Sequence, residues 1–225
     1  MNFSRSSSRV AALAVVLTAA LWPCGALRAA NSAPAISDFE KVFATTNDYT
    51  AILHVHEAKG TETQDRVYQY QFMKPHYVKT LILDGADKGS GGVWVGGDQV
   101  SGHQGGILSG FHRKVAVDDP RAVSLRGVTI PEGLLQRIVE NYATIPGKLT
   151  QSDGGKIGGV PTDRLDLKTT DPSANGGISE QILYLSKETH WPVRQIMYAG
   201  SQIVLDESVA DLKINTGLMQ ADFPF

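Results

Sequence analysis

Hydrophobic and polar positions alternate along several short segments of this chain. In segment 66–72, three aromatic residues, Tyr68, Tyr70 and Phe72, are separated by glutamines. Because residues two apart lie on the same face of a β-strand, this spacing puts the rings on one face and the amides on the other. The pattern predicts an antiparallel sheet that buries one face.

Further strands are expected where β-branched and aromatic residues gather between turn residues. These strands cover 49–57, 77–83, 93–95, 164–168, 181–186, 193–198 and 202–211. The pairs Lys59-Gly60, Lys74-Pro75 and Gly200-Ser201 are typical of turns, and 169–177 is typical of a loop. Ten of the 23 glycines lie between Gly85 and Gly110. They favour loops and bent strands over a phosphate-binding loop.

Two segments have the spacing of amphipathic helices. The first runs from Ser37 to Asn47 and begins with the capping-box pair Ser37 and Glu40. The second runs from Thr129 to Ala143 and carries a broad apolar stripe that includes Leu134 and Ile138. We therefore predict an α+β fold, with one curved antiparallel sheet and two or three helices on its concave, apolar face.

The N-terminal residues have the pattern of a secretory signal peptide. Arg5 and Arg9 precede an apolar run from Val10 to Trp22, and small residues follow. A run of thirteen residues is too short to span about 30 Å of hydrocarbon as a helix. We predict that residues 1–30 are a signal peptide, that 31–225 form one domain, and that the protein is exported.

Cleavage is expected after Ala29 or Ala30, with Ala29 favoured because Arg28 fits the −3 position poorly. The lone cysteine, Cys24, stands where a lipoprotein would carry its lipid anchor. Pro23, directly before it, departs from the small residue typical of such sites. A cysteine removed with the signal peptide is therefore favoured over a lipidated one.

Composition narrows the classes of function. Hydrophobic residues make up 42% of the chain, which excludes a disordered chain. The 21 Lys and Arg and 23 Asp and Glu give a net charge of −2, which disfavours a nucleic-acid partner. Residues 1–30 hold three basic residues and no acidic one, so the mature chain has a net charge of −5. A single cysteine excludes a disulfide framework, an iron–sulfur cluster and a Cys-rich zinc site.

The sequence gives little evidence for a catalytic site. The sequence has no Gly-x-Ser-x-Gly elbow and no Walker or dinucleotide-binding glycine motif in the required context. The best metal candidate is His54-x-His56, which supplies two ligands where zinc needs three or four. Asp118-Asp119 is typical of a turn, and Asp163 with Asp166 of a solvated strand face. We expect no catalytic residue, no metal and no cofactor.

Three segments in this order resemble the LolA/LolB-like superfamily of periplasmic lipoprotein carriers. They are 68–79 leading to Leu83-Asp84-Gly85; Val93-Trp94-Val95 with Asp98-Gln99-Val100; and Trp191-Pro192-Val193-Arg194 with 211–215 and Asp222-Phe223. The resemblance covers about Ser37 to Phe225 and is closest to an uncharacterised branch similar to outer-membrane lipoprotein-sorting proteins.

The resemblance implies a strongly curved antiparallel half-barrel with helices covering an apolar cavity. The cavity would be lined by Tyr68, Tyr70, Phe72, Leu81, Leu83, Trp94, Leu134, Ile138, Leu183 and Leu185. For each of these residues alone, a place in a packed core is the other interpretation. Lys79 stands near the position where the carriers have an arginine tied to lid closure and ligand release, but it lacks the bidentate contacts of Arg.

By this resemblance we expect a non-enzymatic periplasmic carrier or binding protein for lipids or lipoprotein acyl chains. Its partners would be the acyl chain and, transiently, components of the inner or outer membrane, and the protein would be a monomer. One alternative is an envelope-stress sensor of the same fold. A second, less favoured, is a metal-dependent hydrolase that uses His54 and His56.

Overall fold

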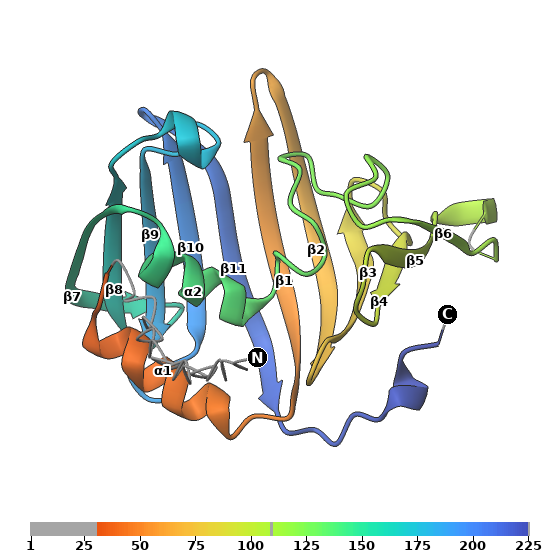
Figure 1. The fold of residues 1–225 in the computed structure, drawn as a ribbon, viewed down its shortest axis with the longest axis horizontal. Coiled ribbons are helices and arrows are strands. Elements are labelled where there is room, and N and C mark those ends of the chain that lie inside the picture. Colours follow the sequence, from red (N-terminus) through yellow and green to blue (C-terminus); the bar gives the residue numbers. More distant parts are fainter. Residues whose placement is uncertain (1–30, 109, 225) are drawn as a thin grey trace, which may run out of the picture.

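A computed structural model describes residues 31–108 and 110–224, so the predicted signal peptide and Cys24 lie outside the described residues. Eleven strands form one antiparallel sheet in the order β6-β5-β4-β3-β2-β1-β11-β10-β9-β8-β7 (Figure 1). The strands are β1 (Asp48–Lys59), β2 (Glu62–Met73), β3 (Tyr77–Gly85), β4 (Gly91–Trp94), β5 (Gln99–His103), β6 (Arg113–Ala116), β7 (Gly147–Ile157), β8 (Val160–Thr169), β9 (Glu180–Ser186), β10 (Pro192–Ala199) and β11 (Gln202–Ile214).

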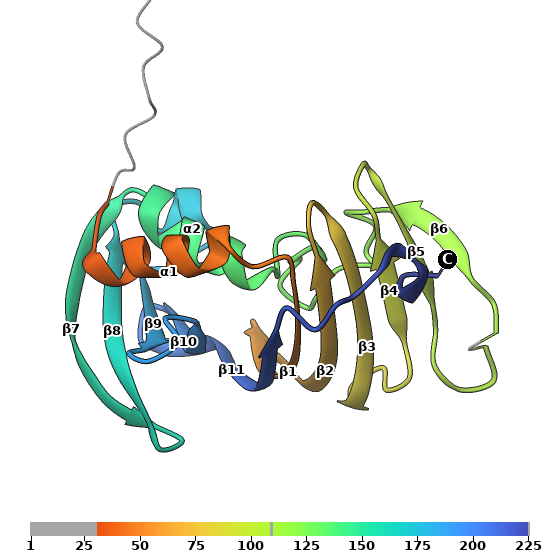
Figure 2. The ribbon, with the colours of Figure 1, turned by 90° about the horizontal axis from the view of Figure 1, so that it is seen from below.

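Two α-helices, α1 (Pro34–Ala44) and α2 (Leu135–Thr144), lie on one face of this sheet. Figure 2 shows them on the inner side of the curve, with β7 and β8 on one side of them and β1 and β2 on the other. Three short 3₁₀ turns complete the elements: η1 (Gly106–Leu108), η2 (Ser173–Asn175) and η3 (Gln220–Asp222). The predicted α+β fold, a curved antiparallel half-barrel sheet covered by helices, is confirmed.

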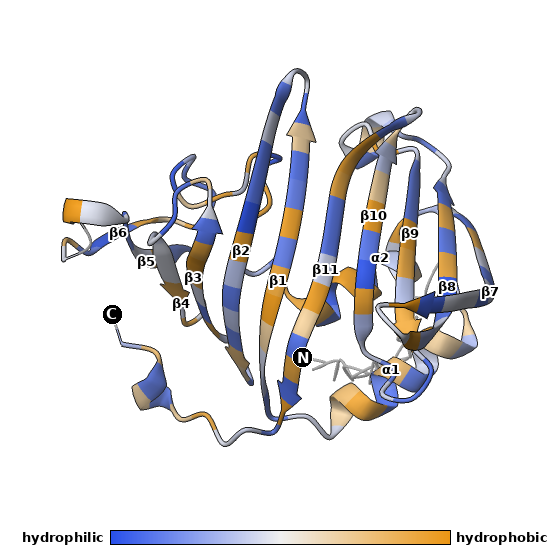
Figure 3. Cartoon of the chain, turned by 180° about the vertical axis from the view of Figure 1, so that it is seen from behind, coloured by the Kyte–Doolittle hydropathy of each residue, from blue (hydrophilic) through white to orange (hydrophobic). Residues whose placement is uncertain are grey.

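The register of the strands shows which side chains share a face. Tyr49 pairs with Phe72, and Phe72 pairs with Val78, so these three side chains point to the same side of the sheet. All three are at most 1% exposed and belong to the core between the sheet and the helices. We call this side the inner face and the opposite side the outer face. Seen from behind in Figure 3, the central strands alternate between hydrophobic and hydrophilic residues, as a sheet with one buried face requires.

An aromatic cluster joins α1 to the inner face. The Trp191 ring centroid lies 5.3 Å from that of Phe39 and 6.1 Å from that of Phe43, both on α1. It also lies 5.2 Å from the ring of Tyr49 on β1, which is 5.0 Å from the ring of Phe72 on β2. Edge-to-face and tilted pairs at these distances are favourable, so the cluster fixes the helix against the sheet.

Both helices begin at residues other than those predicted. α1 begins at Pro34, whose fixed φ suits the first turn, so Ser37 is an exposed residue inside the helix and not its cap. The prediction of a capping box at Ser37 and Glu40 is therefore wrong. Thr129 does donate from its backbone N–H to Glu132 Oε2 at 2.9 Å, but this contact closes a separate turn, and α2 begins only at Leu135.

The strands β5, β6 and β7 have no counterpart in the sequence prediction. β7 contains Gly154 and Gly155 within a mostly polar run, which hides its strand character. A Cβ at position 154 would lie 2.4 Å from Thr162 Oγ1 on β8, so only glycine allows this close approach. Neither helix in residues 31–108 and 110–224 is long and apolar enough to cross a membrane.

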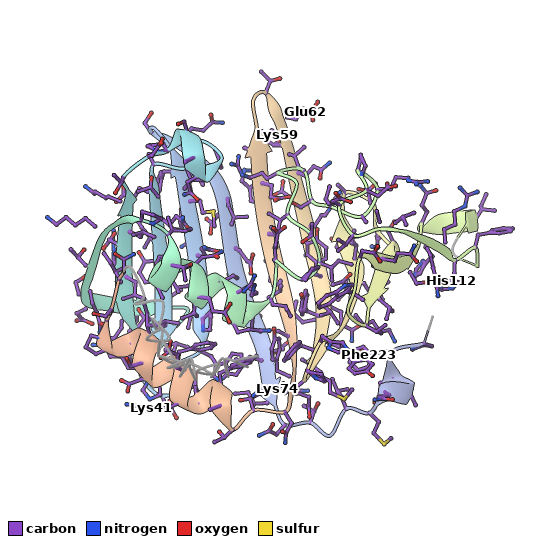
Figure 4. The ribbon with its side chains drawn as sticks, viewed as in Figure 1. Lys41, Lys59, Glu62, Lys74, His112 and Phe223 are labelled. Carbon is purple, nitrogen blue, oxygen red and sulfur yellow. The ribbon has the colours of Figure 1, made fainter. Side chains whose placement is uncertain are left out.

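The C-terminal tail is held by a buried carboxylate. Asp48, 3% exposed, accepts hydrogen bonds from Thr216 N (2.6 Å), Thr216 Oγ1 (2.7 Å) and Gly217 N (3.2 Å). Further along the tail, the ring of Phe223 lies 5.6 Å from that of Tyr77, and Figure 4 shows Phe223 beside the lower end of the sheet.

We expect Asp48→Ala to free this segment. Hydrogen bonds to a charged group contribute about 1.5–3 kcal/mol, which corresponds to at least a tenfold rise in local opening. Amide hydrogen exchange at Thr216 and Gly217 should therefore be at least tenfold faster. Asp222→Ala is the control, because the Asp222 carboxylate accepts a local bond from Met219 N (2.7 Å) and the backbone carbonyl that accepts from Lys79 is kept. Unchanged exchange in Asp48→Ala would show that Asp48 does not hold the tail.

Candidate functional site

The inner face contains a cleft of about 480 Å³ where the ends of α1 and α2 approach β2 and β4. It lies near the Lys74 end of β2, opposite the hairpin end that carries Lys59 and Glu62 in Figure 4. The residues that line it are Phe43, Phe72, Lys74, Pro75, His76, Trp94, Pro131, Leu134, Gln136, Arg137 and Glu140. The cleft thus has aromatic and aliphatic walls and a charged rim, which suits an apolar ligand with one polar end.

Lys74 forms one side of the mouth of this cleft. Its Nζ donates to Phe43 O at 2.7 Å and lies 4.4 Å from the centre of the Phe43 ring. The lysine therefore satisfies a carbonyl at the end of α1 and also attracts the ring electrostatically. On the other side, Arg137 Nη1 donates to Glu140 Oε2 at 2.7 Å, along one face of α2.

α2 is tied to the sheet by the hydroxyl of Tyr49. This hydroxyl accepts from Leu135 N and donates to Gln136 Oε1, both at 3.2 Å. The Tyr49 side chain is fully buried, and burial raises its pKa far above its ordinary value. The phenol is therefore neutral at every physiological pH and serves as a hydrogen-bonding link.

The structure brings most of the predicted lining residues to the inner face. Phe72, Trp94 and Leu134 line the cleft itself. Tyr70, Ile138, Leu183 and Leu185 are at most 5% exposed and form the core behind it, while Tyr68 packs against that core half-buried. Side chains of the protein fill the inner face behind the cleft in this conformation.

Three of the predicted residues lie on the outer face instead. Leu81 pairs with Gln69, on the side opposite to that of Tyr70 and its partner Thr80. Leu83 is 38% exposed, and Lys79 donates from Nζ to Asp222 O in the C-terminal tail at 3.1 Å. These three residues therefore do not line the cleft.

Sequence reasoning also missed two buried carboxylates on the inner face. Glu57 on β1, 3% exposed, accepts from Ser124 Oγ at 2.6 Å and from Leu125 N at 3.1 Å, which attaches the segment 117–134 to the sheet. Glu207 on β11 is 9% exposed. Burial, and then the nearby charge of Glu57, raise the pKa of Glu207 to about 7. The sequence does contain a signal of this burial, because each Glu belongs to the set of alternate strand positions that is otherwise mostly apolar.

The two histidines of the metal hypothesis lie on the outer face. With Arg194, Asp206 and other residues they line a polar hollow of about 540 Å³, and His56 Nδ1 lies 2.8 Å from Asp65 Oδ1. Among the described residues, no group of three or more His, Cys, Asp or Glu side chains is placed to hold a metal ion. His54 and His56 therefore have no third ligand within that part of the chain.

Solved structures share this architecture. An uncharacterised conserved protein from Thermus thermophilus is 12% identical, with a TM-score of 0.54 over 84% of this chain and 90% of that one. MucB is 14% identical, with a TM-score of 0.51 over 86% of this chain, which spans 64% of the MucB chain. A LolA superfamily protein from Nitrosomonas europaea is 12% identical, with a TM-score of 0.40 over 86% of this chain and 99% of that one.

No protein-family model matches the sequence, and no curated protein matches it either. At 12–14% identity the structural likenesses show the fold alone. The fold shared with the Thermus thermophilus protein and with MucB agrees with the half-barrel that the resemblance in the sequence implied.

Proposed function

We propose that this protein, which has a LolA-like fold, is a non-enzymatic periplasmic carrier or binding protein for lipid or lipoprotein acyl chains. The observation that carries the proposal is the cleft between the helices and the inner face. Its walls include Phe43, Phe72 and Trp94, and the packed core of the inner face lies directly behind it. The exported location rests on the predicted signal peptide.

The energetic reason for such a site is the cost of an acyl chain in water. A chain of about 16 carbons, at about 0.8 kcal/mol for each CH₂ group, costs on the order of 12 kcal/mol to expose. A cleft of about 480 Å³ lies within the range of about 300–1,000 Å³ typical of small-molecule sites. Longer cargo would enter by displacing the helices that now cover the inner face.

Few polar links oppose such a movement of the helices. At the start of α1, Ala35 N donates to Gln151 Oε1 on β7 at 3.1 Å. At its end, Lys74 holds the carbonyl of Phe43, and α2 is held through Tyr49. Lys74 also donates to Ala44 O at 3.4 Å, and the Tyr142 hydroxyl lies beside Gln195. The core between the helices and the sheet is otherwise built of apolar side chains, which an acyl chain can replace with little change in chemistry.

A sensor of envelope stress is the second candidate. It is favoured by the fold shared with MucB, which has also been solved in complex with MucA(peri). A sensor would bind a protein partner in addition to lipid. The two functions are separated by whether a lipid-loaded sample passes its lipid to acceptor membranes without a second protein.

We expect Trp94→Glu to lower the affinity for an apolar probe at least tenfold. A carboxylate in the wall of the cleft must be desolvated when the probe binds, which costs more than about 1.4 kcal/mol. The measurement is a fluorescence titration with N-phenyl-1-naphthylamine. Phe111→Glu is the matched control, since Phe111 is 71% exposed and does not line the cleft. Equal affinities in the two variants would argue against binding in the cleft.

A further inference from the structure

The inner face changes character along its strands. Near α1 it is aromatic and aliphatic, whereas towards the hairpin of β1 and β2 it becomes polar. This second zone holds Gln64, Glu57, Glu207, Gln195 and Gln181, one from each of β2, β1, β11, β10 and β9, and we call these five residues the polar cluster. Glu207 pairs directly with Gln195, and Glu57 pairs directly with Gln64.

Several polar atoms of this cluster have no partner. Gln181, Gln195 and Glu207 are 1%, 3% and 9% exposed. Within residues 31–108 and 110–224, no hydrogen bond reaches Glu207 Oε1, Gln181 Oε1, Gln64 Oε1 or Gln195 Nε2. A buried polar atom left without a partner costs about 1–3 kcal/mol, so four of them in one zone indicate a surface made to meet a polar group. Three of the four are acceptors, which call for a donor.

The charged residues of this polar zone also favour a ligand that donates hydrogen bonds, and one with a positive charge. Neither Glu57 nor Glu207 takes part in any of the nine ion pairs of the described residues. The nearby guanidiniums are engaged elsewhere. Arg66 donates to Tyr68 OH at 3.2 Å and pairs with Asp87, and Arg126 donates to Ala58 O at 2.9 Å. Glu207 thus lies beside a second carboxylate, and no cation of the described residues forms an ion pair with either of them.

The tyrosine hydroxyls of this region make no hydrogen bond to Glu207 Oε1 within the described residues: Tyr68 OH accepts from Arg66 Nη1, and Tyr142 OH, beside Gln195, is itself without a partner. Tyr49 OH donates to Gln136 Oε1 and Tyr70 OH donates to Ile130 O at 3.1 Å. An anionic group would be repelled by the two carboxylates, and a neutral hydroxyl would leave their repulsion in place. A primary ammonium group offers three donors and a positive charge, so it matches both the unpartnered acceptors and the charge.

We propose that Glu207, with Glu57 beside it, receives the primary ammonium group of an amphiphilic cargo. This rests on the proposed function, because it assigns the polar end of the molecule whose alkyl chain occupies the cleft. Arg66 and Glu207 are both paired with Val55 on β1, so the two lie at the same level of the sheet. Arg66 is six positions along β2 from Phe72, which lines the cleft. At about 3.3 Å for each residue, the two ends are about 20 Å apart, a distance that an extended alkyl chain would cover once it has displaced the helices from the inner face.

Three ligands with the same alkyl chain test the proposal: dodecylamine, dodecanol and dodecanoate. Each is titrated at pH 7.5 against protein that carries N-phenyl-1-naphthylamine, and displacement of the probe gives the affinity. We expect dodecylamine to bind at least tenfold more tightly than dodecanol, and dodecanoate to bind most weakly. In Glu207→Gln the advantage of the amine should vanish, while the affinity for dodecanol stays within about twofold.

Asp206→Asn is the matched control, since it removes one negative charge from the neighbouring position of β11 on the outer face, where Asp206 contacts Arg194. The preference for the amine should persist in this variant. Equal binding of amine and alcohol by the unaltered protein, or a preference that survives Glu207→Gln, overturns the ammonium site and leaves acyl binding intact. Failure of the probe and of all three ligands to bind overturns both proposals.

Discussion

Replacing Trp191 with Ala is expected to lower the free energy of unfolding by about 4 kcal/mol. The Trp191 side chain is 1% exposed and meets rings from α1 and from β1 at centroid distances of 5.2–6.1 Å. Its removal leaves a cavity between helix and sheet that neighbouring side chains fill only in part. No hydrogen bond reaches its indole nitrogen from the described residues, so the loss is one of packing.

Urea unfolding followed by circular dichroism measures this effect. A domain of this size usually has a stability of about 5–15 kcal/mol, so the variant should still fold, with a lower midpoint. Phe111→Ala is the control, because a ring that is 71% exposed contributes within about 0.5 kcal/mol. A loss below about 1 kcal/mol in Trp191→Ala would contradict the aromatic cluster as the link between α1 and the sheet.

The second large effect is expected at Glu207, as a stability that depends on pH. Its pKa of about 7 in the folded protein lies above the ordinary value of 4.5. Below pH 4.5 the carboxyl is protonated in both states and makes no pH-dependent contribution to stability. Between pH 4.5 and about 7 the unfolded chain releases the proton while the folded one keeps it, so stability falls by about 1.4 kcal/mol for each pH unit. The total loss is about 3 kcal/mol.

Glu207→Gln removes this loss, because the amide has no proton to release. The difference in unfolding free energy between the variant and the unaltered protein should therefore grow by about 3 kcal/mol in favour of the variant from pH 4.5 to pH 8. Urea titrations at several pH values give this difference. Glu62→Gln, an exposed carboxylate in the β1–β2 hairpin, should change stability by less than about 0.5 kcal/mol throughout. A pH-independent difference for Glu207→Gln would show that Glu207 is not buried beside Glu57.

The fold could be predicted from the sequence wherever apolar residues occupy only one of the two sets of alternate positions in a strand. The alternation at Tyr68, Tyr70 and Phe72 correctly gives the buried face of β2. The short strands β5 and β6 and the glycine-containing β7 carry no such alternation, because their strand state depends on neighbours far away in the sequence. The predicted helix starts were wrong because Ser37 with Glu40, and Thr129 with Glu132, have only the spacing of a capping box, whereas α1 begins at Pro34 and α2 at Leu135.

The site could be predicted less well, and β3 shows why. Apolar residues occupy both faces of this strand, with Val78 and Ile82 on one face of the sheet and Leu81 and Leu83 on the other. Only the pairing with β2, which includes an irregularity between Val67 and Tyr68, decides that the first pair faces the helices. The polar cluster was missed for a different reason: each Glu stands alone among apolar residues of its own strand, and only the pairing of β1 with β11 brings Glu57 and Glu207 together.

Native mass spectrometry of protein purified from the periplasm without detergent tests the proposed function most directly. We expect a complex of the protein with acyl-chain lipid that is lost or much reduced in Trp94→Glu and retained in Phe111→Glu. Lipids that carry a primary amine should be enriched among the bound species and lose that enrichment in Glu207→Gln. A protein that is free of lipid in every preparation, and that also fails to bind N-phenyl-1-naphthylamine, would contradict acyl-chain binding at the inner face.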